Sequence, residues 1–120
     1  MVYDIETTIA DDPKNAEFLL GYAMYPIEDN KMHYEYISQE NLPDFVQKML
    51  DFNGYIIGYN NIRFDNPVCI HNTTKKQEDI DTINEKTIDL FVFLYSLTRK
   101  RLGLNKVANA LVGIQKTLES

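Results

Sequence analysis

The sequence predicts an α/β domain built on a mixed sheet, and two observations support that prediction. The amino-terminal third contains three short apolar segments of the kind that form β-strands, at residues 1–5, 18–25 and 32–37. From residue 42 onward, segments with helical periodicity alternate with further apolar segments. Antiparallel strands followed by alternating helices and strands are typical of a mixed sheet with flanking helices. The expected order is β-β-β-α-β-α-β-α-α.

The first three strands are predicted from local composition. Residues 1–5 are apolar and favour β-structure, and the acidic and threonine residues after them indicate the end of a strand. Residues 10–15 are polar and predict a loop, whereas residues 18–25 are rich in aromatic and aliphatic side chains and predict a buried strand. A short polar turn at residues 28–31 joins this strand to residues 32–37, so the pair is expected to form an antiparallel hairpin.

The first helix is predicted from a stripe of apolar side chains. The stripe has the spacing i, i+3, i+4, i+7 and i+8 of an amphipathic helix and consists of Leu42, Phe45, Val46, Met49 and Leu50. Asn41 precedes the stripe as a natural N-cap, and Asn53 with Gly54 favours the end of the helix.

The second half of the chain predicts two more strands and three more helices. Residues 55–59 predict a buried central strand, and residues 60–70 a helix with a proline in its first turn. Residues 73–85 are polar and charged and predict an exposed loop. Residues 86–90 predict a last short strand, which leads into an apolar helix through Leu97. The helical stripe then recurs, with a glycine placed for a C-cap, at Leu104, Val107, Ala108, Leu111 and Gly113.

The totals limit the classes of function. A chain of 120 residues suits one domain, spanning residues 1–120. The net charge of −6 argues against broad electrostatic binding of nucleic acid, but an enzyme that holds phosphates through metal ions needs carboxylates as ligands. The single cysteine, Cys69, forms no internal disulfide, and there is no zinc-binding pattern. Without a signal peptide or a membrane span, the protein is expected to be soluble and cytoplasmic.

Asp4 and Glu6 are the first candidate site residues. They stand two apart on a predicted strand, so their side chains point to the same face. Two adjacent carboxylates repel each other unless a cation lies between them, and oxygen ligands suit Mg²⁺ or Mn²⁺. Taken alone, the pair is also typical of solvated surface acids.

The second candidate element is IIGYNNIRFDNP, residues 56–67. It leads from a buried strand into a helix, with Asn60 or Asn61 as a cap and Asp65 in the first turns. If this strand lies beside the first, Asp65 meets Asp4 and Glu6 at the carboxyl ends of neighbouring strands, where open α/β sheets bind ligands. The alternative is that Asp65 only stabilises a helix amino terminus and that Asn60 is only a cap.

Together these segments resemble a known family. DIETT (residues 4–8) and GYNNIRFDNPV (residues 58–68) resemble the first two motifs of DEDD-type 3′–5′ exonucleases of the ribonuclease H-like superfamily. The sequences of these two motifs most resemble those of bacterial and phage proteins related to the proofreading domain of family B DNA polymerases. TIDLFVFL (residues 87–94) and RLGLNKVANALVGIQK (residues 101–116) are similar to the helical segments that follow the second motif. The resemblance spans essentially the whole chain and implies a ribonuclease H-like mixed sheet.

The resemblance also implies roles for individual residues. Asp4, Glu6 and Asp65 match catalytic metal ligands, which in the complete family hold two Mg²⁺ or Mn²⁺ ions and hydrolyse the 3′ end of DNA or RNA. The substrate-binding positions that the resemblance implies are Thr7, Asn60, Asn61 and Phe64, where Asn60 and Asn61 are alternative matches to one motif asparagine and Phe64 is equally suited to the core. Asp89 resembles a frequent acid at the end of the last strand, with a structural role.

The chain departs from the family at the third motif. No Tyr-x-x-x-Asp or His-x-x-x-x-Asp pair follows Asp65, so the fourth carboxylate and the water-activating residue are missing. We therefore expect a domain truncated before the third motif, with weak metal binding, slow cleavage and self-association through sheet surface that a further helix would cover. The alternative is a catalytically inactive nucleic-acid-binding or interaction module with the same fold. An unrelated phosphatase with Asp4 as nucleophile would leave the segment from Asn60 to Asp65 without a role.

Overall fold

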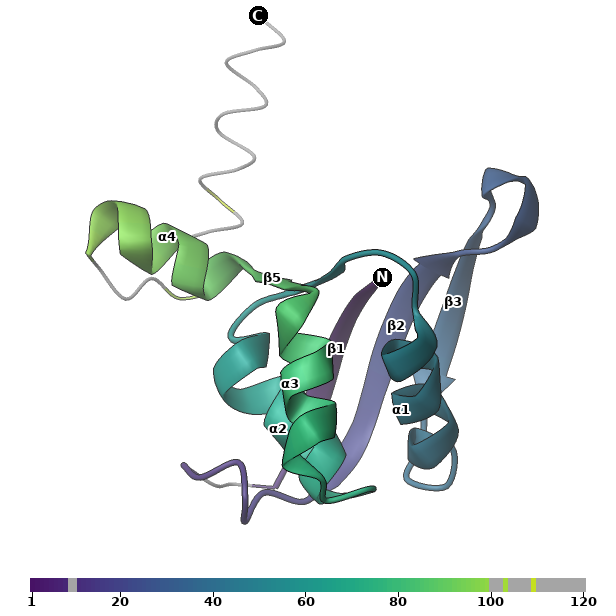
Figure 1. Cartoon of the computed structure of the whole chain (residues 1–120), viewed down its shortest axis with the longest axis horizontal. Coiled ribbons are helices and arrows are strands. Elements are labelled where there is room, and N and C mark those ends of the chain that lie inside the picture. The colour runs from purple at the N-terminus through teal and green to yellow at the C-terminus, as the bar shows by residue number, and fades with distance from the viewer. Residues whose placement is uncertain (9–10, 100–102, 104–108, 110–120) are drawn as a thin grey trace, which may run out of the picture.

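The computed structural model describes residues 1–8, 11–99, 103 and 109. These residues form a five-stranded mixed sheet in the order β3-β2-β1-β4-β5, with helices packed against one face (Figure 1). The central strand β1 (Val2–Thr7) is antiparallel to β2 (Phe18–Pro26) and parallel to β4 (Ile56–Gly58). The predicted α/β fold class is confirmed, with its three antiparallel strands followed by parallel ones.

The two edge strands complete the sheet. β3 (Met32–Ile37) pairs antiparallel with β2, and the connection contains a short 3₁₀ turn at Glu28–Asn30. Asp29 and Asn30 have positive φ angles of 62° and 59°, a conformation that Asp and Asn tolerate better than most residues. The predicted hairpin is therefore confirmed. At the other edge, β5 (Thr87–Asp89) is parallel to β4.

Three helices cover one face of the sheet and enclose the core: α1 (Leu42–Asp51), α2 (Asn66–His71) and α3 (Gln77–Glu85). Alternate β1 side chains point toward them, and Tyr3 and Ile5 are buried. The fully buried core side chains contributed by the helices include Met49, Val68, Ile70 and Ile83. The apolar stripe predicted for α1 is the face that packs on the sheet.

Helix α3 contradicts the loop predicted for residues 73–85. Ile80 and Ile83 lie three residues apart on one side of this helix, and both are buried. Two apolar residues among charged ones are too few to show a helical stripe in the sequence, which is why the helix was missed. Glu78 and Asp79 in the first turn favour a helix amino terminus and are the local signal that pointed to it.

The other face of the sheet carries an apolar row that crosses all five strands. Cross-strand partners share a face, and the chain of partners in the described sheet runs through Tyr34, Met24, Val2, Ile57 and Ile88. Tyr34 is 74% exposed and Val2 41% exposed, so this row, here named the apolar row, lies at the surface.

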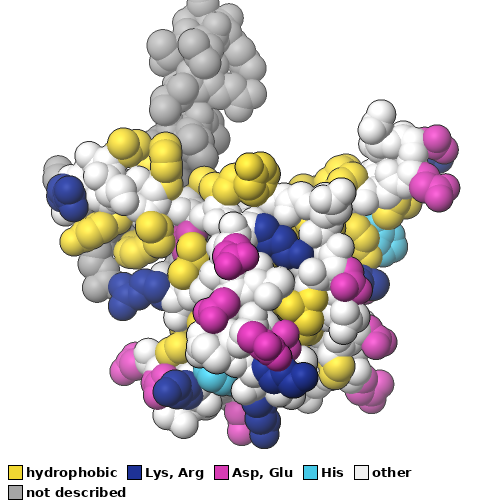
Figure 2. Space-filling model, viewed as in Figure 1, with side chains coloured by type: hydrophobic (Ala, Val, Ile, Leu, Met, Phe, Trp, Pro, Cys, Tyr) yellow, Lys and Arg dark blue, Asp and Glu magenta, His cyan; other side chains and the backbone are white. Residues whose placement is uncertain are grey.

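Helix α4 (Leu90–Thr98) follows β5 and is apolar on most sides. It contains no buried residue, and Phe93 and Leu97 are 57% and 67% exposed. Hydrophobic side chains gather over this helix, away from the mixed charges that cover α3 (Figures 1 and 2). The helix predicted through Leu97 is confirmed. Leu104, Val107, Ala108, Leu111 and Gly113, which predict a further helix, lie outside the described residues. A search of the described helices finds none with the length and hydropathy that crossing a membrane requires.

Candidate functional site

Asp4 and Glu6 lie inside β1 and not at its end. The strand continues to Thr7, two residues beyond the predicted boundary, because Glu6 and Thr7 still pair with β2 across a bulge. Since Tyr3 and Ile5 point into the core, both carboxylates point to the opposite face and are exposed. The two carboxylates therefore share a face, as the spacing predicts.

Asp65 lies beside the same strand. β4 ends at Gly58 while β1 runs on to Thr7, so the carboxyl half of β1 extends past its parallel neighbour. The Asp65 carboxyl group lies in this region, near the backbone N–H of Ile5 and close enough to Asp4 for their charges to interact. Because β1 and β4 are neighbours, the segment that carries Asp65 lies beside Asp4, as expected.

The environment of Asp65 disfavours its ionised form. Its side chain is only 6% exposed, and burial, followed by the negative charge of Asp4, raises its pKa to about 7. The hydrogen bond from the Ile5 backbone acts in the opposite direction and lowers the pKa. A buried carboxyl group beside another carboxylate is typical of a functional site.

A distorted turn sets the direction of Asp65. Asn60 has φ 60° and begins a π-helical turn, Asn61–Asp65, which runs directly into α2. The fully buried Asn61 carboxamide packs so closely on Gly58 that any side chain at position 58 would collide with it. Neither asparagine side chain forms the predicted cap bond, because the turn points Asn61 into the protein and leaves Asn60 left-handed. Asn41 likewise stands at the N-cap of α1, but its carboxamide bonds to Ser38 and Tyr36 instead.

Unpartnered polar atoms concentrate in this turn. Among the described residues, every buried side-chain oxygen or nitrogen without a hydrogen-bond partner belongs to Tyr59, Asn60, Asn61 or Asp65. Buried polar atoms are normally satisfied, so their concentration in one short segment marks it as a functional candidate. The unpartnered atom of Asp65 is Oδ2.

Comparison with known families agrees with this fold. The sequence profile of the ribonuclease H superfamily matches residues 1–120. The chain belongs to the ribonuclease H superfamily. Superfamily members are generally nucleases and typically use divalent metal ions, so a nucleic-acid substrate suits this fold. No curated protein matches the sequence.

The donor set of this ribonuclease H domain suits a hard divalent cation. Asp4 and Asp65 are close enough to repel each other, and Asp65 keeps one carboxylate oxygen without a partner. Carboxylate oxygens are the ligands that Mg²⁺ and Mn²⁺ prefer. Within the described ranges, however, no three His, Cys, Asp or Glu side chains approach closely enough to form a metal cluster. Glu6 lies on the same face of β1 as Asp4 but does not complete a group of three ligands with Asp4 and Asp65. Its role as a metal ligand therefore stays a prediction.

The predicted substrate-binding residues have different surroundings. Thr7 lies at the end of β1, half-buried, and its hydroxyl donates to the Thr8 carbonyl at 3.0 Å. Phe64 is half-buried and packs against the core, which is the second of its two predicted roles. Asn61 is fully buried and Asn60 half-buried, so of the two alternative asparagines Asn60 is the one nearer to solvent.

A buried polar network beneath the site was not predicted. The Tyr3 hydroxyl donates to Asn66 Oδ1 at 2.5 Å, and Asn66 Nδ2 donates to Asn84 Oδ1 at 2.9 Å and to Thr87 Oγ1 at 3.0 Å. The network thus ties β1 to α2, α3 and β5 through the residue that follows Asp65. Burial raises the pKa of the Tyr3 hydroxyl well above its usual value, so it stays protonated as a donor. No spacing in the sequence signals these contacts.

A small apolar pocket adjoins Asp4. Its volume is about 210 Å³, and its lining includes Val2, Ile57, Tyr59 and Leu90 beside the Asp4 carboxylate. The pocket lies on the exposed face of the sheet, where the apolar row passes the candidate site. It therefore offers an apolar surface next to an acidic group.

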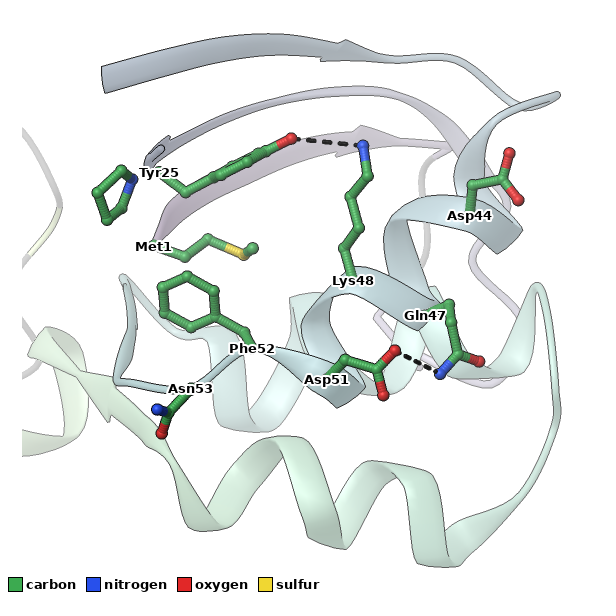
Figure 3. Close-up of a pocket in the computed structure, with 9 residues that line it drawn as sticks. Met1, Tyr25, Asp44, Gln47, Lys48, Asp51, Phe52 and Asn53 are labelled. Carbon is green, nitrogen blue, oxygen red and sulfur yellow. Dashed lines mark hydrogen bonds between the residues drawn. The ribbon is translucent and has the colours of Figure 1, made fainter. Parts of the chain in front are cut away.

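A larger pocket lies elsewhere. It has a volume of about 540 Å³ between α1 and the amino end of β1, and Met1, Tyr25 and Phe52 line it (Figure 3). Lys48, which also lines it, donates to Glu35 Oε1 at 2.9 Å. None of the predicted site residues lines this pocket.

Proposed function

We propose that this ribonuclease H domain is a metal-dependent 3′–5′ exonuclease that hydrolyses phosphodiester bonds at the 3′ end of DNA or RNA. The observation that supports this most is the pair formed by Asp65 and Asp4. A buried carboxyl group with a raised pKa and an unpartnered oxygen lies beside a second carboxylate on the neighbouring strand. A cation between them relieves both the repulsion and the cost of burial.

In this proposal Asp4, Glu6 and Asp65 hold the Mg²⁺ or Mn²⁺ ions. Asp4 shares a strand face with Glu6 and is close enough to Asp65 for their charges to interact, so it would be the carboxylate common to both pairs. When bound, the ions supply charge stabilisation at the phosphate and a water of lowered pKa. The protein residues would bind the ions and orient the substrate. Because carboxylates bind the ions and the ions hold the phosphates, a chain of net charge −6 can still act on nucleic acid.

The surroundings of Asp4 support a nucleic-acid end as substrate. The apolar pocket beside it suits the face of a base, which binds by stacking and apolar contact without readout of its edges. Thr7 follows Glu6 on β1 and Asn60 begins the turn that carries Asp65, and both are proposed to contact the terminal nucleotide. Phe64 is proposed to shape the turn from the core side. Asn61 is proposed to act through the turn, because its carboxamide is fully buried.

The missing third motif lowers the expected activity. No Tyr-x-x-x-Asp or His-x-x-x-x-Asp pair follows Asp65, so these 120 residues provide three of the four family carboxylates. We propose that, without a fourth carboxylate among these residues, the three acids bind metal weakly and cleave slowly. The same absence supports the second candidate function, an inactive nucleic-acid-binding or interaction module.

An exonuclease assay tests the proposal. A single strand labelled at its 5′ end, incubated with the chain and Mn²⁺, should shorten slowly from its 3′ end, and Asp4→Ala and Asp65→Ala should each abolish the trimming. Asp81→Asn removes an exposed carboxylate on α3 and is the matched control, which should trim like the unaltered chain. Trimming that persists in Asp65→Ala would refute the assigned site.

Calorimetric titration with Mn²⁺ separates the two candidate functions. A nuclease site should release or absorb heat that Asp4→Ala and Asp65→Ala remove, because each variant deletes a ligand. A binding module without a metal site should give no heat that depends on either residue, while still retaining a labelled single strand in a gel-shift experiment.

A further inference from the structure

The carboxylate of Asp89 joins two segments that the sequence keeps apart. Its Oδ1 accepts from the backbone N–H of Asn60 at 2.8 Å, and its Oδ2 accepts from the backbone N–H of Ile62 at 3.0 Å. Oδ1 also accepts from the N–H groups of Phe91 and Val92 at 3.0 and 3.4 Å, which makes Asp89 the N-cap of α4. The side chain is only 4% exposed.

The pairing of β4 with β5 places the Asp89 carboxylate next to the turn that carries Asp65. Gly58 and Asp89 are partners in the parallel pairing of β4 with β5, so the end of β5 lies beside the start of the turn that carries Asp65. The turn starts at Asn60 in the left-handed region, at φ 60°, which costs free energy for a residue other than glycine. Two charge-assisted hydrogen bonds, donated to Asp89 by the N–H groups of Asn60 and Ile62, offset that cost by fixing the backbone on both sides of Asn61.

We propose that Asp89 is the positioning residue of the site: through the N–H groups of Asn60 and Ile62 it fixes the turn that aims Asp65 at Asp4. This inference rests on the proposed function, since it concerns the geometry of the proposed metal ligand. Asp89 does not itself touch the metal or the substrate. It acts as the outer partners of metal ligands generally act, by restricting the orientation of the group that binds.

The chemistry of the contact explains why a carboxylate is required. Both oxygens of Asp89 accept hydrogen bonds from the turn, one from each N–H. An asparagine has one accepting oxygen, so its NH₂ group would face either Asn60 or Ile62 as donor against donor. A serine can cap α4 with its single oxygen but cannot hold both N–H groups of the turn. Asp89→Asn and Asp89→Ser therefore disturb the turn while retaining an oxygen able to cap α4.

The test compares metal affinity with folding in the full chain. Mn²⁺ affinity is measured from the electron paramagnetic resonance signal of free Mn²⁺, and helix content and the unfolding midpoint are measured on the same samples. Asp89→Asn and Asp89→Ser should keep the helix content and weaken Mn²⁺ binding roughly tenfold or more, as loss of an outer partner does in other metal sites. Asp81→Asn, which removes one exposed charge, should leave the affinity unchanged.

The outcomes separate this inference from the proposed function. If the unaltered chain shows no Mn²⁺ binding that Asp65→Asn removes, the proposed function fails and this inference fails with it. If the unaltered chain binds Mn²⁺ and both Asp89 variants bind equally well, only the positioning role is refuted, and Asp89 is a helix cap alone.

If neither Asp89 variant folds, a measurement on the unaltered chain tests the positioning role of Asp89. Metal held by Asp65 must stabilise whatever positions Asp65, because coupling between sites is reciprocal. Saturating Mn²⁺ should therefore slow hydrogen exchange at the Asn60 and Ile62 amides relative to amides in α1. Exchange at those two amides that Mn²⁺ leaves unchanged would overturn the proposal.

Discussion

At the scale of single residues, the burial of Asp65 costs the folded state free energy once this carboxyl group is ionised. Its pKa is raised from 3.8 in the unfolded chain to about 7 in the folded one. The folded state therefore holds its proton more tightly, and the contribution of Asp65 to the free energy of unfolding falls as pH rises from about 4 to about 7. Above pH 7 the penalty is complete, at roughly 4 kcal/mol for a shift of this size, counting about 1.4 kcal/mol per pKa unit.

The variant Asp65→Asn tests that penalty. Asparagine resembles the protonated carboxyl group, so this variant should be more stable than the unaltered chain at pH 8, by up to roughly 4 kcal/mol, and nearly equal to it at pH 4. Urea unfolding at both pH values measures the difference. A variant that is less stable than the unaltered chain at pH 8 would show that Asp65 is ionised and well stabilised there. Asp81→Asn should show no such pH dependence, because Asp81 is exposed.

The sequence predicts the acidic residues of the candidate site but not the contacts that hold them in place. Alternation along a strand is a property of every strand, so the shared face of Asp4 and Glu6 followed from their spacing alone. The Tyr3–Asn66 hydrogen bond joins residues 63 positions apart, and nothing local to either residue signals it. The left-handed conformation of Asn60 is not predicted for a related reason, because Asn is also a preferred N-cap residue and the sequence does not distinguish the two roles.

At the scale of elements, α3 shows where periodicity alone fails. Helix α1 is predictable because it buries four apolar residues at helical spacing, whereas α3 buries only Ile80 and Ile83. Its position is determined by contacts with α1 and α2 and by the Asn84 carboxamide, which accepts from Asn66. A short helix of this kind depends on tertiary contacts that a single segment cannot reveal.

Truncation of Ile83 tests whether α3 is held by those contacts. Ile83 is fully buried, so Ile83→Ala should lower the free energy of unfolding by about 2–5 kcal/mol, the range for a large aliphatic side chain removed from a core. Thr82→Ala, at the neighbouring exposed position, is the matched control and should change stability by less than about 0.5 kcal/mol. Equal effects in the two variants, measured by chemical denaturation, would mean that α3 does not pack as described.

At the scale of the whole molecule, the apolar row is a partly exposed apolar surface that crosses all five strands of the sheet. We propose that two copies of the chain associate through it, because an exposed apolar surface that spans a sheet favours burial. Tyr34, at 74% exposed, lies at one end of the row, and Tyr34→Lys should shift the chain toward monomer in light scattering at increasing concentration. Lys31→Glu, in the hairpin turn outside the row, is the control. A monodisperse monomer for the unaltered chain at all concentrations would remove the proposal.

The early end of β4 has a consequence for how this sheet can evolve. The pairing of β4 with β1 stops near Val2, so the N–H of Ile5 is free to donate to the Asp65 carboxyl group. A longer β4 would have supplied a backbone carbonyl to this N–H instead. Extending β4 by even two residues would add ladder hydrogen bonds and at the same time push Asp65 off the edge of the central strand. Any change that lengthens β4 should therefore remove Asp65 from the proposed metal site.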